Sequence, residues 1–137
     1  MHNTNHYLTM FIIMLLAGLL STMNVWVDKL SDIRYGINDF YMIFLMTGWM
    51  FLFMGYNDNN NQIMLIGLAT VIIFIYLIRT QMFVNQNQYI KNMIPHHSMA
   101  IHMSKKLLKK DNNIDNLLNN IIETQINEIK FMKEKEK

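Results

Sequence analysis

The stretch LTMFIIMLLAGLLSTMNVWV, residues 8–27, contains no charged residue. A helix of about 20 apolar residues spans the roughly 30 Å hydrocarbon core of a bilayer. Two shorter uncharged stretches follow, at Phe40–Tyr56 and Ile63–Ile78. Three such stretches in succession leave almost no polar face, which a soluble bundle would need. The sequence therefore predicts an all-α protein with three transmembrane helices, at about 8–27, 40–56 and 63–82.

The composition changes after Arg79, where polar and charged residues return. With 137 residues, 52% of them hydrophobic, and a net charge of +2, the chain has room for one membrane region and a small appended domain. We expect a membrane domain at 1–84 and a helical hairpin domain at 85–137. The run Asn57–Gln62 predicts a tight turn between the second and third membrane helices.

Lys and Arg are unevenly distributed among the connecting segments. The N-terminal segment and the Asn57–Gln62 turn contain neither residue, whereas Lys29, Arg34, Arg79 and Lys91 fall on the other side of the predicted membrane. Positively charged loops favour the cytoplasmic side. The sequence predicts a multi-pass integral membrane protein with its N-terminus outside and its C-terminal hairpin in the cytosol.

Two helices are expected on either side of the turn-forming run 111–113. A loop this short makes the two helices antiparallel neighbours. Asn113 or Asp115 is the expected N-cap of the second helix, and the charged tail 133–137 is expected to fray. The second helix carries an apolar stripe that also includes two polar residues, and its members are Leu118, Ile121, Ile122, Gln125, Glu128, Ile129 and Met132.

Three imidazoles and three thioethers lie within the segment Met93–Met103. At 100° per residue, one helix face is expected to carry Met93, His96, His97 and Met103, with Met99 at its edge and His102 pointing away. Pro95 is expected to break the helix here, either as a kink or as the first residue of a new helix.

Imidazole and thioether groups together favour a soft or borderline metal, above all Cu(I). Equal rise along two antiparallel helices brings Met132 level with Met93 and His97, so Met132 can complete a site. A carboxylate or amide nearby can hold a histidine through its second ring nitrogen. The predicted metal ligands are Met93, His96, His97, Met99, Met103 and Met132, supported by Gln125 and Glu128. The alternative is that the methionines fill a core and the polar residues pair across the hairpin.

These residues resemble a known family, the domain of unknown function 305 proteins. The family motif is Met-Ile-Pro-His-His followed by an Ala and a Met, then a hydrophobic pair, Gln, Glu and Met in the next helix. It is matched here by Met93–His97, Ala100, Met103, Ile121–Ile122, Gln125, Glu128 and Met132. The resemblance implies a ferritin-like bundle domain and, for some members, copper binding. One helix pair is half of such a bundle, so we expect a homodimer to complete a four-helix bundle.

The leading hypothesis is a membrane-anchored protein for copper sequestration or homeostasis. One alternative is a structural membrane protein whose hairpin mediates oligomerisation. Another is a copper transporter, because Met42, Met46, Met50 and Met54 recur along the second helix and are similar to the Met-x-x-x-Met of copper-transporter channels, with His2 and His6 available to collect metal. We expect no enzymatic activity, because no nucleophile-and-base set or Glu-x-x-His pair is present, and no nucleic-acid partner.

Overall fold

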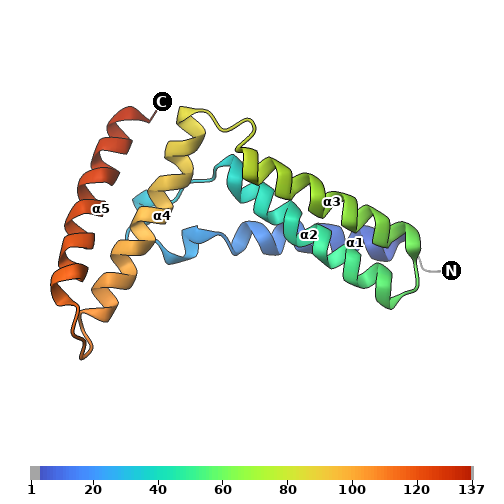
Figure 1. Cartoon of the computed structure of the whole chain (residues 1–137), viewed down its shortest axis with the longest axis horizontal. Helices are drawn as coiled ribbons and strands as arrows, with labels where there is room; N and C mark the ends of the chain where they lie inside the picture. The colour runs from blue at the N-terminus through green and yellow to red at the C-terminus, as the bar shows by residue number, and fades with distance from the viewer. Residues whose placement is uncertain (1–3, 137) are drawn as a thin grey trace. The chain divides into compact units, whose positions relative to one another are not determined.

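The computed structural model describes residues 4–136, and every regular element in that part of the chain is helical. Short η1 (Met23–Trp26) and η2 (Leu30–Asp32) helices occupy the loop after α1. The α-helices in Figure 1 are α1 (Thr4–Leu20), α2 (Ile37–Asn57), α3 (Asn61–Thr80), α4 (Gln86–Leu107) and α5 (Asp115–Lys135). The predicted all-α class is confirmed. His2 lies outside the described residues.

The chain forms two compact units. The first unit contains α1, α2 and α3, and the second contains Met23–Gly36 together with the chain from Val84 onward. The loop between the first two long helices therefore belongs with α4 and α5, and we call it the inserted loop (residues 23–36).

The predicted membrane-spanning stretches are confirmed by length and composition. The segments Asn5–Trp26, Ile37–Asn57 and Asn61–Thr80 are long and apolar enough to cross a membrane. Many of their large apolar side chains are exposed within the first unit, including Leu16, Phe53 and Ile72. In a bilayer such side chains face lipid rather than water.

The first helix ends earlier than the predicted residue 27. α1 stops at Leu20, where the N–H of Ser21 bonds the carbonyl of Gly18. Beyond it, the Asn24 side chain donates to the carbonyl of Arg34 at 2.7 Å and accepts from the N–H of Arg34 at 2.9 Å. Asn side chains compete with the helix for backbone partners in this way, so the helix does not continue through η1.

The turn between α2 and α3 is tight, as predicted. Asn60 caps α3, because its side chain accepts from the N–H groups of Gln62 and Ile63. Close to the turn, a Cβ added to Gly55 would lie 2.4 Å from the backbone nitrogen of Met64. The backbones of α2 and α3 are therefore in direct contact near this turn.

In the second unit α4 and α5 lie side by side and are joined by the short loop 108–114, so they run in opposite directions (Figure 1). The core between them is apolar and contains Ile90, Ile94, Ile101, Ile129 and Met132, with Met93 and Ile122 packed against it. The predicted cap of α5 is wrong: its N-cap is Ile114, which makes no side-chain cap hydrogen bond. Asn112 instead accepts from the Ile114 N–H and shapes the turn.

The predicted helix break at Pro95 is also wrong. α4 runs without interruption from Gln86 to Leu107 with Pro95 inside it. A proline in a helix interior removes one hydrogen bond and disfavours the helix by about 3 kcal/mol. Pro95 and its neighbours Ile94 and Ser98 are buried, and this burial offsets the lost bond.

Candidate functional site

His97 projects from α4 toward α5. Its Nδ1 atom lies 3.0 Å from Oε2 of Glu128, and the two side chains are 14% and 48% exposed. The distance is that of an ion pair, although no hydrogen bond of good geometry reaches the buried Nδ1 atom from the described residues. We interpret the contact as electrostatic, with the carboxylate holding the imidazole on its Nδ1 side.

The same side chains border an open cavity of about 380 Å³ on the hairpin. Its walls come from α4 and α5 only and are Tyr89, His97, Asn127, Glu128, Phe131 and Met132. Met93 packs against the core cluster that contains Met132. The structure thus brings one imidazole, one carboxylate and one thioether to a single opening.

The other predicted ligands lie elsewhere on α4. His96 is exposed, with its ring centre 6.0 Å from that of His97. Met103 is 52% exposed and borders a different cavity together with His102. Met99 is half-buried, as is Gln125 on α5. α4 contacts both α5 and the inserted loop, so its buried positions form two faces rather than the one that the sequence predicted.

Within residues 4–136, no group of three or more His, Cys, Asp or Glu side chains could hold a metal ion. A metal at His97 would therefore need thioether ligands or ligands from another molecule. The residues present fit a soft metal in part, because thioethers of Met93 and Met132 lie in the same region of the core.

The environment of His97 favours its neutral form. Burial lowers the pKa of His97, and the nearby charge of His96 adds to this effect. The Glu128 carboxylate acts in the opposite direction without reversing the net shift. A neutral imidazole is the form that binds a metal.

Asp32 is the charged residue that the sequence analysis missed. Its side chain is only 3% exposed. It accepts a 2.6 Å hydrogen bond from the Ser98 hydroxyl and a 2.5 Å bond from Lys133 Nζ. Ser98 is fully buried and accepts in turn from the N–H of Asp28 at 2.9 Å. The inserted loop is thus joined to α4 and α5 through one buried carboxylate.

Two further ion pairs flank Asp32. Lys105 reaches Asp28 at 2.7 Å, and Arg34 bonds both carboxylate oxygens of Glu136 at 2.7 and 2.9 Å. Hydrogen bonding by Arg34 lowers the pKa of Glu136. The prediction that the segment from residue 133 frays is therefore wrong as far as Glu136, because the inserted loop supplies ion-pair partners that lie far away in the sequence.

We expect acid to weaken the second unit through Asp32. Burial raises the pKa of Asp32, but hydrogen bonds from Lys133 and Ser98 outweigh it, and the net pKa lies below its usual value. The stability that the ionised group contributes is complete above the unfolded pKa of about 3.9 and is lost as the pH falls through the lower folded pKa. Thermal unfolding of the detergent-solubilised chain should show a melting temperature that falls below about pH 4, and less steeply for Asp32→Asn. Identical pH profiles for the two proteins would contradict this assignment.

Comparison with known proteins agrees with the family that the sequence predicted. The family model described as "Domain of unknown function (DUF305)" matches residues 78–135, which include α4 and α5. An uncharacterized protein of Acanthamoeba polyphaga mimivirus is 44% identical in an alignment of 137 positions that covers 95% of this chain and 90% of the viral protein. This chain belongs to the DUF305 family. No solved structure matches this DUF305 chain. The DUF305 match contains His97, Glu128 and Met132, whereas Asp32 lies outside it.

Proposed function

We propose that this DUF305 protein is anchored in a membrane and binds copper, as Cu(I), to sequester or buffer it. The observation that carries the proposal is the His97 imidazole, which faces the Glu128 carboxylate at Nδ1 and shares a cavity with Met132. A carboxylate on one ring nitrogen leaves Nε2 as the nitrogen for a metal and orients the ring. Thioether sulfur then selects a soft ion such as Cu(I) over hard cations.

A second copy of the chain would complete the site. One hairpin supplies half of a four-helix bundle, and two large apolar side chains beside the His97 cavity are exposed, Tyr89 at 54% and Phe131 at 61%. Pairing two hairpins in a ferritin-like bundle would cover these rings and bring two His97 side chains into one bundle. The uneven distribution of Lys and Arg supports a cytosolic hairpin and an external N-terminus.

Cu(I) titration of the detergent-solubilised chain against a competing chelator tests the proposal. We expect His97→Ala to weaken Cu(I) binding by more than about 10-fold, the lower limit for loss of a residue that only supports a metal ligand. Glu128→Gln should weaken it less, because it removes the charge beside Nδ1 but leaves the His97 imidazole in place. His102→Ala is the matched control, since His102 lies on the same helix at a different cavity, and it should bind as the unchanged protein does.

The alternatives predict other results. If the unchanged protein binds no Cu(I) and His97→Ala disrupts assembly, the hairpin is a structural oligomerisation element. Transport would require that Met-to-Leu changes in α2 reduce copper uptake. Met42 and Met46 are 50% and 39% exposed in the single chain, so they could line a pathway only between several copies.

A further inference from the structure

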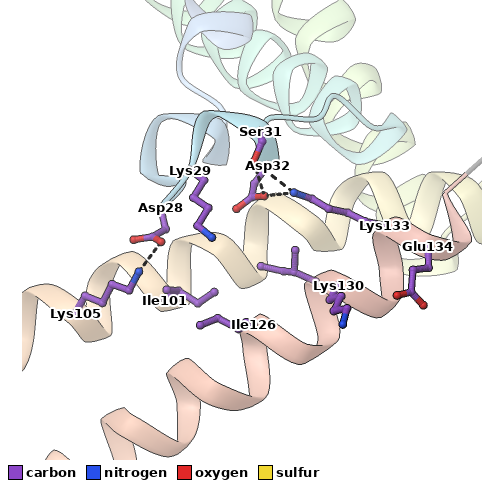
Figure 2. A pocket seen from close by; sticks show the side chains of 11 residues that line it. Asp28, Lys29, Ser31, Asp32, Ile101, Lys105, Ile126, Lys130, Lys133 and Glu134 are labelled. Carbon is purple, nitrogen blue, oxygen red and sulfur yellow. Dashed lines mark hydrogen bonds and ion pairs between the residues drawn. The ribbon is translucent and has the colours of Figure 1, made fainter.

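We propose that a second cavity of the hairpin unit binds an anionic phospholipid of the membrane that anchors the chain. This cavity, of about 420 Å³, lies between the inserted loop and the helices α4 and α5 (Figure 2). We call it the lysine cavity. Its lining is Asp28, Lys29, Ser31, Asp32, Ile101, Lys105, Ile126, Ile129, Lys130, Lys133 and Glu134. His97 is not among these residues, so the inference is independent of metal binding.

The charges of the lysine cavity favour an anion. Four lysines face three carboxylates there, and two of the carboxylates are already paired, Asp28 with Lys105 and Asp32 with Lys133. Within the described residues, Lys29 and Lys130 have no carboxylate at ion-pair distance. They are exposed, and Glu134 is the one carboxylate of the lining outside the two pairs. The ammonium group of Lys130, and that of Lys29, which also attracts the Asp32 carboxylate from beyond ion-pair distance, thus remain for a ligand phosphate.

The floor of the lysine cavity is apolar. Ile101 and Ile129 are buried, whereas Ile126 is 45% exposed. In Figure 2 the Lys29 side chain extends from the inserted loop toward the side on which Ile101 and Ile126 lie. A small soluble anion would leave these isoleucines uncovered. An amphiphile would place its phosphate at the lysines and its glycerol and first methylenes on Ile126.

Chain connectivity limits how far the inserted loop can lie from α2. Asp32 precedes Ile37, the first residue of α2, by only five positions. Five extended residues span at most roughly 18 Å. Lipid binding at this cavity rests on the proposed membrane anchoring: with α2 in a bilayer, the headgroup layer begins at the end of the hydrocarbon core, and the inserted loop is tethered within reach of it. A membrane lipid is therefore the anionic amphiphile present at the highest local concentration.

Native mass spectrometry of the full chain in neutral detergent provides the test, with short-chain phosphatidylglycerol and phosphatidylcholine as probes. A lysine near an anionic headgroup contributes about fivefold in affinity. We expect phosphatidylglycerol to bind in preference to phosphatidylcholine, and Lys29→Gln/Lys130→Gln to lose about 25-fold of that binding. The matched control is Lys106→Gln/Lys109→Gln, which removes two exposed lysines outside this cavity and should bind normally.

Two further measurements distinguish a specific lipid site from nonspecific attraction between the lysines and an anion. Ile126→Ser should weaken phosphatidylglycerol binding, because the apolar part of the ligand loses its contact. If the two double lysine variants lost phosphatidylglycerol binding equally, the proposal would be overturned, since the net charge of the protein alone would then explain binding. The proposal also fails if glycerol 3-phosphate displaces the lipid at equal concentration, because the site would then recognise a soluble anion.

Discussion

Asp32→Ala is expected to destabilise the unit of the inserted loop, α4 and α5 by about 3 kcal/mol. The substitution removes the carboxylate that the buried Ser98 hydroxyl and Lys133 both contact. Loss of one partner leaves a buried polar group unsatisfied, and this penalty exceeds the value of an ordinary surface pair. Lys133 is 33% exposed and can reach water, which limits the loss to the lower part of the range for buried pairs.

Thermal or urea unfolding of the detergent-solubilised chain measures this effect. Asp28→Ala is the matched control, because Asp28 lies in the same loop and pairs with Lys105, whose side chain is 44% exposed. The Asp28 side chain is 13% exposed, more than that of Asp32, and its partner reaches water, so the control should lose clearly less stability than Asp32→Ala. Equal effects of the two substitutions would show that burial of Asp32 does not matter.

The fold could be predicted from the sequence where the pattern is long and uniform. Uncharged stretches identified the three helices that are long and apolar enough to cross a membrane, and the run Asn57–Gln62 identified the turn between α2 and α3. The end of α1 could not be found in this way, because it depends on Asn24 bonding the backbone of Arg34. The continuity of α4 through Pro95 likewise depends on tertiary burial, which overrides the local preference of proline.

The candidate site was predictable only where it follows helix geometry. Equal rise along antiparallel helices predicted that Met132 lies level with Met93, and Met132 belongs to the core cluster against which Met93 packs. Periodicity could not show that His96 is exposed while His97 faces Glu128, because α4 packs against two elements instead of one. Asp32 gave no local signal, since its partners Ser98 and Lys133 lie more than 60 residues away.

Gly67→Ala is expected to destabilise the α2–α3 hairpin by about 2 kcal/mol, although alanine is the better helix former. A Cβ at Gly67 would lie 2.3 Å from the backbone nitrogen of Leu52 and 2.8 Å from the carbonyl oxygen of Gly48. Backbone atoms cannot move aside as a side chain can, so α2 and α3 would have to separate along the contact. Small residues at such interfaces allow membrane helices to pack closely.

Gly48→Ala separates this steric effect from helix propensity. The three atoms nearest to its added Cβ would be side-chain atoms of Thr70 and Val71, each at 3.1 Å, and a shift of a few tenths of an ångström would relieve these contacts. The propensity gain of about 1 kcal/mol then offsets the contact, so Gly48→Ala should leave stability nearly unchanged. Unfolding in detergent, followed by the fluorescence of Trp49 on α2, compares the two variants. If Gly67→Ala were as stable as Gly48→Ala, α2 and α3 could not be in backbone contact at Gly67, and the hairpin would be held by its larger side chains instead.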